Sequence, residues 1–245
     1  ADGSITMAFG ITEPDAGSDA MGMNTRAVKV KDRYVINGSK AFITNGTVAD
    51  FMLFYAKTEP SRGSHGISAF YLLTDGMKGL HREKIKKWGM RSSPTALITF
   101  EDVEIPEENL IGGLNRGGAI LTNGLCTERI TLSGCCLGSQ RACLELSLKY
   151  ARERVQFGKP ISSFQFIQGK LADMYTHYMA SKWMAYSAAA YCDSLEKKVG
   201  GKGTDLDRKA AAALLFCGEM GTKIASEAVQ IHGGYGYCQE YPVSR

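Results

Sequence analysis

The sequence lacks a strong charge of either sign and any long hydrophobic run. It holds 29 Lys and Arg against 25 Asp and Glu, and a net charge of +4 is too small to indicate a nucleic-acid-binding face, although it suits a polyanionic ligand. No apolar run reaches the roughly 18–20 residues that a membrane helix needs. No signal peptide is visible either, but the sequence starts at Ala1 and not at a methionine, so it does not exclude a leader that has been removed.

Metal-binding and disulfide patterns are also missing. The 7 cysteines form no C-x-x-C pair and are odd in number, which favours buried thiols in a reducing compartment over a disulfide framework. The 4 histidines show no metal-ligand spacing, so a zinc-type site is not predicted. No G-x-G-x-x-G follows a predicted strand, which excludes a Rossmann dinucleotide site.

The first half of the chain has the pattern of a β domain. The whole composition, 44% hydrophobic and 22% charged, is that of a globular protein with a sizeable core. Runs of β-branched and aromatic residues predict strands over residues 23–31, 33–37, 51–57, 67–74 and 96–103. Asn37-Gly38 and Asn45-Gly46 are dipeptides typical of hairpin turns. We therefore expect a compact antiparallel β-barrel or sandwich.

The second half is helical in pattern. Gly112-Gly113 and Gly117-Gly118 mark the change. Apolar residues then recur at helical spacing, which predicts helices over residues 119–151, 164–195 and about 204–231. Thr204 is the expected N-cap of the third helix, and Gly233-Gly234 is its expected stop.

These patterns predict an α+β chain of two domains. The β domain covers residues 1–112, and an antiparallel helical bundle covers residues 113–245. Residues 197–207 are expected to form a polar loop between helices. Three long helices are one fewer than in a four-helix bundle, so the bundle is incomplete.

The strongest signal is a set of short segments in a fixed order. They are residues 9–19 (FGITEPDAGSD), 42–46 (FITNG), 127–129 (TER), 154–160 (RVQFGKP) and 230–236 (QIHGGYG). Together they resemble the acyl-CoA dehydrogenase family of FAD enzymes. Members of that family have a helical domain before the first segment and a short tail after the last one. By this resemblance the chain is a fragment.

The resemblance implies that the first segment forms part of a flavin site. The segment begins at Phe9, and the backbone around Ile11 together with Thr12 would hydrogen-bond the polar edge of the flavin ring, where negative charge develops on reduction. Ser18 would lie near the FAD pyrophosphate or the CoA arm of the substrate. Taken alone, the segment also fits an ordinary loop between strands.

The second segment resembles the family's Trp-Ile-Thr, with Phe42 in place of the tryptophan. Its ring would pack near the flavin. Ile43 follows in the strand, and Thr44 would reach toward the ring nitrogen that receives the hydride. The alternative is an edge strand that leads into the Asn45-Gly46 turn.

The fourth segment resembles the family's Arg-x-x-Phe-Gly motif. In the family this arginine, here Arg154, contacts the FAD pyrophosphate of a neighbouring subunit, for which a planar guanidinium is well shaped. Gln156 and Phe157 belong to the same motif, and Gln165 on the next helix fits the cluster. The alternative is a solvated helix end.

The last segment resembles the loop that receives the adenine end of FAD, again across a dimer interface. It contributes Gln230, Gly233 and Gly234, and the glycines let the backbone approach a ligand closely. The alternative is a helix C-cap.

The resemblance offers two places for the catalytic base. In many members the glutamate lies beyond the position where this chain ends. In others, including isovaleryl-CoA and long-chain acyl-CoA dehydrogenases, it precedes an arginine on a helix, as Glu128 precedes Arg129 here. Glu128 is therefore the candidate base, in an apolar pocket that would raise its pKa, and Arg129 a substrate or CoA contact. Cys126 stands where those members have Asp. The alternative for Glu128 is that it is an ordinary exposed residue of the helix.

The implied function is FAD-dependent α,β-dehydrogenation of an acyl-CoA thioester in fatty acid metabolism and β-oxidation. Electrons would pass to an electron-transfer flavoprotein, and the enzyme would be a homotetramer, cytoplasmic in bacteria or in the mitochondrial matrix of eukaryotes. An acyl-CoA oxidase that uses O₂ and a non-catalytic binding relative are the alternatives. The sequence leaves the acyl group open.

Overall fold

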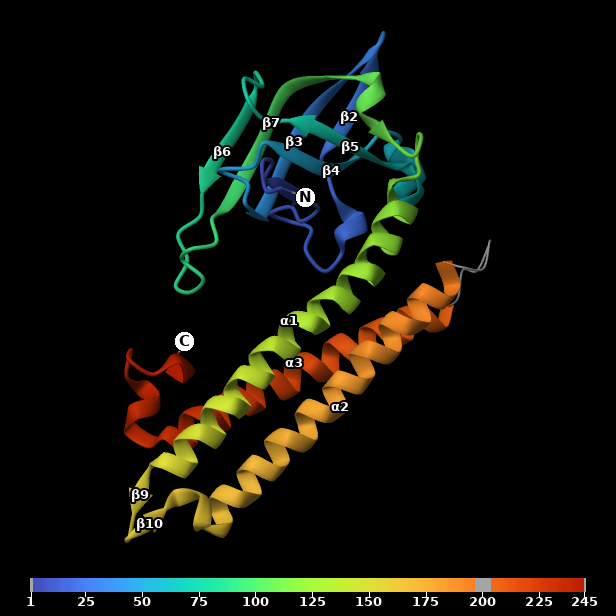
Figure 1. Cartoon of the computed structure of the whole chain (residues 1–245). Helices are drawn as coiled ribbons and strands as arrows, with labels where there is room; N and C mark the ends of the chain where they lie inside the picture. Colours follow the sequence, from blue (N-terminus) through green and yellow to red (C-terminus); the bar gives the residue numbers. More distant parts are fainter. Residues whose placement is uncertain (1, 197–203, 245) are drawn as a thin grey trace. The chain divides into compact units, whose positions relative to one another are not determined.

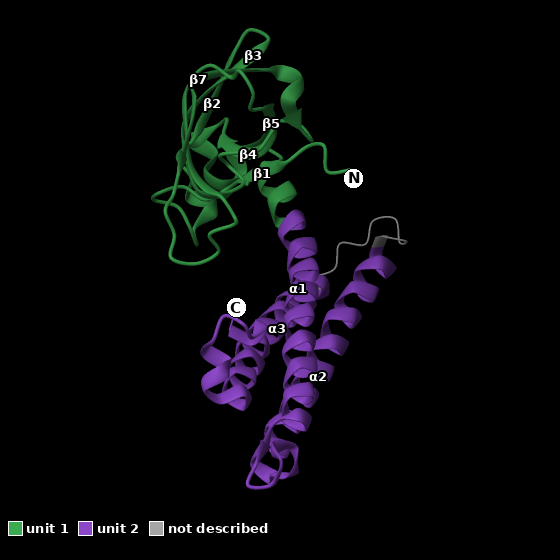
Figure 2. Cartoon of the chain, turned by 60° about the vertical axis from the view of Figure 1, so that its left-hand side comes forward, with its two compact units in different colours: residues 1–122 green, residues 123–245 purple. Residues whose placement is uncertain are grey.

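The computed structural model describes residues 2–196 and 204–244 (Figure 1). The chain divides into two compact units, Ala1–Thr122 and Asn123–Arg245 (Figure 2). The first unit is built on a β-sheet and the second on helices, so the predicted α+β class is confirmed. The domain boundary predicted at residues 112–113 falls just before α1 (Gly117–Glu153) and stays a prediction.

The first unit contains one 8-stranded sheet with the order β6-β7-β3-β2-β4-β5-β8, and β1 pairs with β4. The strands are β1 (Met7–Gly10), β2 (Arg26–Val30), β3 (Arg33–Thr44), β4 (Phe51–Lys57), β5 (Ile67–Leu73), β6 (Leu80–Lys84), β7 (Thr95–Pro106) and β8 (Leu110–Ile111). Most neighbours are antiparallel, as predicted. The pairings of β4 with β1 and with β2 are parallel, so the sheet is mixed.

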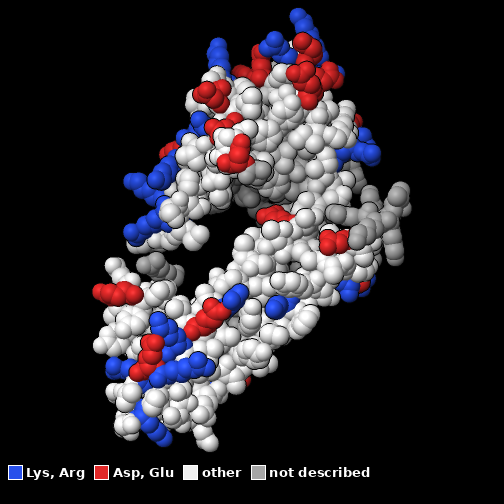
Figure 3. Space-filling view, viewed as in Figure 1, with Lys and Arg blue, Asp and Glu red and all other residues white. Residues whose placement is uncertain are grey.

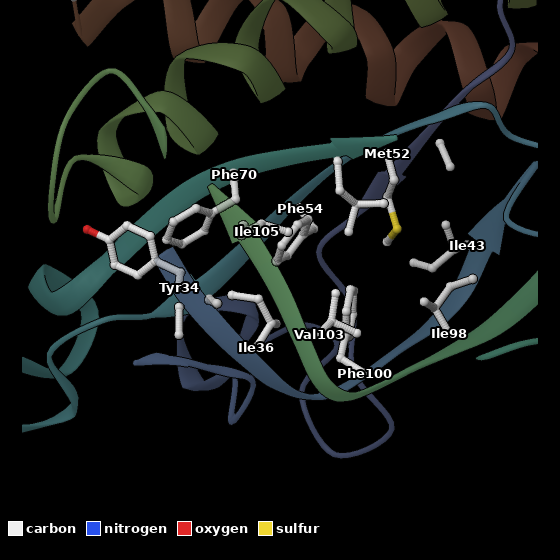
Figure 4. Packing of buried hydrophobic residues seen from close by; sticks show 14 of the residues in the cluster. Tyr34, Ile36, Ile43, Met52, Phe54, Phe70, Ile98, Phe100, Val103 and Ile105 are labelled. Carbon is white, nitrogen blue, oxygen red and sulfur yellow. The ribbon is translucent and has the colours of Figure 1, made fainter. Parts of the chain in front are cut away.

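The core of this unit is aromatic at its centre. Phe54 on β4 is fully buried, and its ring lies 5.7 Å from that of Phe70 and 5.0 Å from that of Phe100 (Figure 4). These rings come from three strands that the sequence predicted. All three rings belong to the buried hydrophobic cluster of the sheet.

The Asn37-Gly38 dipeptide does not form the predicted hairpin turn; it lies inside β3. The pairing of β3 with β7 shifts register between Ile36 and Gly38. Asn37 donates to Asp102 Oδ1 over 2.8 Å and accepts from the Asp102 backbone N–H over 2.9 Å. Gly38 has φ +141°, and a Cβ there would lie 2.6 Å from Thr25 Cα. The dipeptide therefore forms a β-bulge at a close approach of two strands.

The Asn45-Gly46 dipeptide does form a turn, with Asn45 at φ +62° and the Gly46 N–H donating to Ile43 O. It is not a hairpin between paired strands, because β3 pairs with β2 and β7 and not with the following β4.

Three strands of the sheet were absent from the prediction for a physical reason. β1 has only 4 residues and β8 only 2. β6 has four exposed positions out of 5, so none of the three shows an alternating apolar pattern. The pairing of β6 with β7 holds it in the sheet instead.

The second unit contains three long helices and a small hairpin. From Asn123 onward α1 lies in this unit, together with α2 (Gln165–Glu196) and α3 (Thr204–His232). Each lies within about two residues of its predicted bounds. Figure 1 shows α2 and α3 side by side and antiparallel. The hairpin of β9 (Val155–Gln156) and β10 (Lys159–Pro160) turns through Phe157 and Gly158, both at positive φ (+53° and +76°).

The predicted polar loop falls largely outside the described residues, which exclude 197–203. Its last part, from Thr204, is already helical, so the loop prediction is wrong there. The side chain of Thr204 is not described, and its N-cap role stays a prediction. The predicted stop at Gly233-Gly234 is confirmed, because α3 ends at His232.

The core between these helices is aliphatic. Leu144 on α1, Met174 on α2 and Ile224 on α3 are buried together. A buried hydrogen bond of 2.8 Å from Gln140 Nε2 to Cys217 O joins α1 to α3. Of the cysteines, Cys126 and Cys217 are buried and Cys135 is exposed, so the prediction of buried thiols is right only in part.

None of the helices that the structure describes combines the length and the apolarity needed to cross a membrane. Within residues 2–196 and 204–244, no group of His, Cys, Asp or Glu is arranged to hold a metal ion.

Candidate functional site

The two segments predicted to hold the flavin are neighbours in the first unit. The Ala41 backbone N–H donates to Thr12 O over 2.8 Å, and Lys40 Nζ donates to Ile11 O over 3.1 Å. The loop that follows β1 is thereby attached to the second half of β3. Glu13 and Ala16 exchange backbone hydrogen bonds that close the turn before Ser18. Ser18 itself is exposed.

A buried ion pair underlies this junction. Lys40 Nζ lies 2.8 Å from Glu13 Oε1, and the two side chains are 0% and 5% exposed. Glu13 also accepts hydrogen bonds from the backbone N–H groups of Asn24 and Thr25. Burial alone would raise the pKa of Glu13, but the Lys40 ammonium and the hydrogen bonds hold it below its ordinary value. Sequence reasoning gave neither side chain a role.

Phe42 is strained and exposed. It has φ +59°, at a register shift of β3 against β7 between Lys40 and Ile43, and it is 67% exposed. A bulky residue at positive φ costs about 1–3 kcal/mol, and such strain is concentrated at functional sites. Phe42, whose ring the sequence places near the flavin by resemblance, is therefore exposed on a bulge of β3.

The remaining predicted residues of this unit differ in setting. Ile43 is buried in the core, Thr44 is exposed at the end of β3, and Thr12 is partly buried. Phe9 packs edge-on against Tyr55 with ring centroids 5.7 Å apart. Burial raises the pKa of that tyrosine to about 12. The Phe9 side chain thus supports the loop from the side of the core.

The second unit holds a pocket of about 410 Å³. It is formed by the end of α1, strand β9, the end of α3 and the short helix after it (Gly233–Tyr237). Four predicted site residues meet there: Arg154, Gln156, Gly233 and Gly234. The lining also includes residues that sequence reasoning did not assign: Tyr150, Ile161, Ile231, His232, Tyr235 and Cys238.

Three other predicted residues do not line this pocket. Phe157 is 91% exposed at the tip of the hairpin, where its ring lies 6.0 Å from that of Phe164. Gln165 is exposed at the start of α2, and Gln230 is exposed two residues before the end of α3. Their assignment to the cofactor stays a prediction.

One wall of the pocket is a stack of rings. The His232 imidazole is buried, its Nδ1 lies 2.8 Å from Ala228 O, and its ring lies 4.2 Å from that of Tyr150 at an interplanar angle of 25°. Tyr241 packs edge-on against both rings. His232 stands directly before Gly233-Gly234 in the motif, which is the signal by which it could have been found.

Arg154 supplies the positive charge of the pocket. Its guanidinium lies 5.6 Å from the centre of the Tyr235 ring, and no carboxylate of the described residues forms an ion pair with it. On the face shown in Figure 3, charges of both signs mix at the end of the helical unit that carries β9 and β10, so that face is not broadly basic. A guanidinium that pairs with no described carboxylate and lies beside two glycines fits a phosphate-bearing cofactor such as FAD.

The candidate base lies elsewhere on the same unit. Glu128 is exposed on α1, and its carboxylate forms no hydrogen bond or ion pair with any described residue. The apolar enclosure expected around it is therefore not provided by the described part of this unit. Arg129 lines a separate groove of about 590 Å³ with Asp207 and Leu215 of α3. Burial and Asp207 raise the pKa of the nearby Cys126 thiol to about 11.

Each of the two units matches a domain of known proteins. Residues 8–103 match the family described as "Acyl-CoA dehydrogenase, middle domain", and residues 115–245 match "Acyl-CoA dehydrogenase, C-terminal domain". This chain belongs to the acyl-CoA dehydrogenase family. The family that the ordered motifs resembled is therefore confirmed, and with it the fold of each unit.

Three similar proteins show how far the likeness extends. A mitochondrial isovaleryl-CoA dehydrogenase of Solanum tuberosum is 42% identical over 97% of this chain and 56% of its own length. The structure of butyryl-CoA dehydrogenase from Megasphaera elsdenii is 42% identical, with a TM-score of 0.90 over 98% of this chain and 61% of that chain. The structure of PigA with FAD and proline is 34% identical, with a TM-score of 0.91 over 98% and 61%. This acyl-CoA dehydrogenase chain thus spans little more than half the length of its relatives.

Proposed function

We propose that the protein catalyses FAD-dependent α,β-dehydrogenation of an acyl-CoA thioester. The observation that carries the proposal is the pocket of the helical unit, where no carboxylate of the described residues pairs with the Arg154 guanidinium beside Gly233-Gly234. That donor set suits a diphosphate cofactor, and it occurs in a chain of this family. A relative of similar fold is described with FAD.

The proposal divides cofactor binding between the predicted segments. Arg154 and Gln156 hold the pyrophosphate of an FAD bound to a neighbouring subunit, and Gly233-Gly234 admit its adenine end, also across the subunit interface. Ile11 and Thr12 bind the polar edge of the flavin ring, and the exposed Phe42 covers the ring and excludes water. FAD, when bound, supplies the acceptor for the hydride that leaves the β carbon of the substrate.

Glu128 is the proposed base for the proton on the α carbon. Its carboxylate is exposed on α1 and is not engaged by any described residue, so it is available to a substrate. Closure of an apolar substrate around it would desolvate the carboxylate and raise its basicity. Arg129, on the next position of the helix, points about 100° away and serves the CoA side of the substrate.

The substrate proposed is a short or branched acyl-CoA, because isovaleryl-CoA and butyryl-CoA dehydrogenases are among the similar proteins. Electrons pass to an electron-transfer flavoprotein, and the enzyme assembles as a homotetramer. The mitochondrial name of the potato relative supports a matrix location if the source is a eukaryote, and a bacterial source implies the cytoplasm.

The experiment mixes the FAD-loaded protein, at its natural length and without oxygen, with a panel of acyl-CoA esters and follows the flavin absorbance. We expect one short or branched ester to bleach the wild-type flavin, and Glu128→Gln to slow bleaching by about 10²–10⁴-fold, the usual contribution of a general base. Glu145→Gln is the matched control, because Glu145 is exposed on the same helix.

Equal bleaching of wild type and Glu128→Gln would move the base away from Glu128 while keeping the activity. A wild-type flavin that no ester bleaches would overturn the proposed dehydrogenation itself. Rapid O₂ uptake on adding the ester would favour the oxidase alternative.

A further inference from the structure

The buried ion pair of the first unit joins the two segments that the proposed function assigns to the flavin. Lys40 lies on β3, two positions before Phe42, and its ammonium donates to Ile11 O over 3.1 Å and to Glu13 Oε1 over 2.8 Å. The next residue, Ala41, donates its backbone N–H to Thr12 O. Two consecutive residues of β3, Lys40 and Ala41, are therefore hydrogen-bonded to two consecutive residues of the loop, Ile11 and Thr12.

Glu13 extends the same network to a third segment. Its carboxylate accepts from Lys40 and from the backbone N–H groups of Asn24 and Thr25, ahead of β2. Every strong donor and acceptor of the pair is thus directed at backbone or at the partner charge. Such a fully paired buried network fixes one arrangement of its segments.

The Lys40 side chain is enclosed close to the end of β1. A Cβ at Gly10 would lie 3.4 Å from Lys40 Cγ, an ordinary van der Waals distance, but 2.4 Å from Met52 Cε, so the glycine leaves room for the methionine. The Lys40 ammonium also lies 3.8 Å from Met23 Sδ, and the lysine side chain has no exposure to solvent.

We propose that Lys40 and Glu13 are positioning residues, which hold the Ile11–Thr12 backbone and the strained turn at Phe42 in the arrangement that binds the flavin. This inference rests on the proposed function. Neither side chain is expected to touch the cofactor, because both are enclosed beneath the loop. Their effect reaches the flavin through the backbone of residues 11–12 and 41–42.

The test compares Lys40→Met and Glu13→Gln with a surface pair. Lys40→Met keeps the length of the stem but removes the ammonium that donates to Ile11 O and to the Glu13 carboxylate. Lys29→Met and Glu107→Gln form the matched control, because these residues make an exposed ion pair between β2 and the turn that follows β7. The readouts are the FAD dissociation constant, the visible circular dichroism of the bound flavin and the thermal midpoint, all for the protein at its natural length.

We expect Lys40→Met to raise the FAD dissociation constant by about tenfold or more and to alter the flavin dichroism at temperatures where the variant is fully folded. Glu13→Gln keeps the volume and one acceptor oxygen, and it should show the same change at smaller size. It therefore keeps the proposal testable if Lys40→Met does not fold. The surface-pair variants should match wild type in both flavin readouts.

A purely structural pair predicts a different result. Folded variants with a lower thermal midpoint but the wild-type FAD affinity and dichroism would overturn the positioning role. Failure of the wild-type protein to take up FAD would instead refute the proposed function, so the two failures are distinguishable.

Discussion

At the scale of single residues, the cations of Arg154 and Lys40 differ in burial and in pairing with a carboxylate. Arg154 lines a pocket with no carboxylate partner among the described residues, and Lys40 is buried with one. The motif around Arg154 could be predicted from the sequence, because its spacing resembles a known phosphate contact. The burial of Lys40 could not, because lysines are rarely fully buried and the pattern of β3 is broken by a bulge.

Replacing Arg154 tests the cofactor pocket. We expect Arg154→Met to raise the FAD dissociation constant by about 10–100-fold, since a hydrogen bond to a charged group contributes about 1.5–3 kcal/mol. The FAD dissociation constant of Arg154→Lys should lie between those of wild type and Arg154→Met, because an ammonium keeps the charge but lacks the planar fork of a guanidinium. Titration of the apoprotein with FAD measures all three.

Arg152→Met is the control for that titration, as Arg152 is exposed on the last turn of α1 and does not line the pocket. If Arg154→Met bound FAD as tightly as wild type, the pocket would not be the pyrophosphate site.

At the scale of elements, helices were easier to predict than strands. The long apolar periodicity of α2 and α3 is a local property, so the sequence could place both within about two residues. The parallel contacts of β4 with β1 and β2 depend on segments far apart in the chain, which no local pattern encodes. The Asn37-Gly38 bulge was mistaken for a hairpin because both structures place a glycine at positive φ.

That bulge makes a stability prediction. Gly38→Ala should lower the free energy of unfolding by about 2–4 kcal/mol, because it combines strain at φ +141° with a clash against Thr25. Gly76→Ala is the control, since Gly76 has φ +63° but open space around its Cα, and it should cost only about 1 kcal/mol. Urea denaturation of each variant checks both values. Equal losses would mean that the close approach at Gly38 contributes nothing.

At the scale of the whole molecule, family membership was predictable because the motifs occur in a fixed order through both units. Composition and charge could not have given it: a net charge of +4 and ordinary globular content fit many classes. The sequence could predict that Arg154, Gln156 and the two glycines contribute to the pocket at the end of the helical unit. It could not predict the contribution of the stacked Tyr150 and His232 rings, because the resemblance gives neither residue a role.

The most direct test of the central claim is the identity of the product. The FAD-loaded protein at its natural length, given isovaleryl-CoA or butyryl-CoA and an artificial electron acceptor without oxygen, should release the α,β-unsaturated CoA ester, identified by mass spectrometry as the substrate minus two hydrogens. Recovery of each ester unchanged across the panel, from a protein with its flavin bound, would contradict the account.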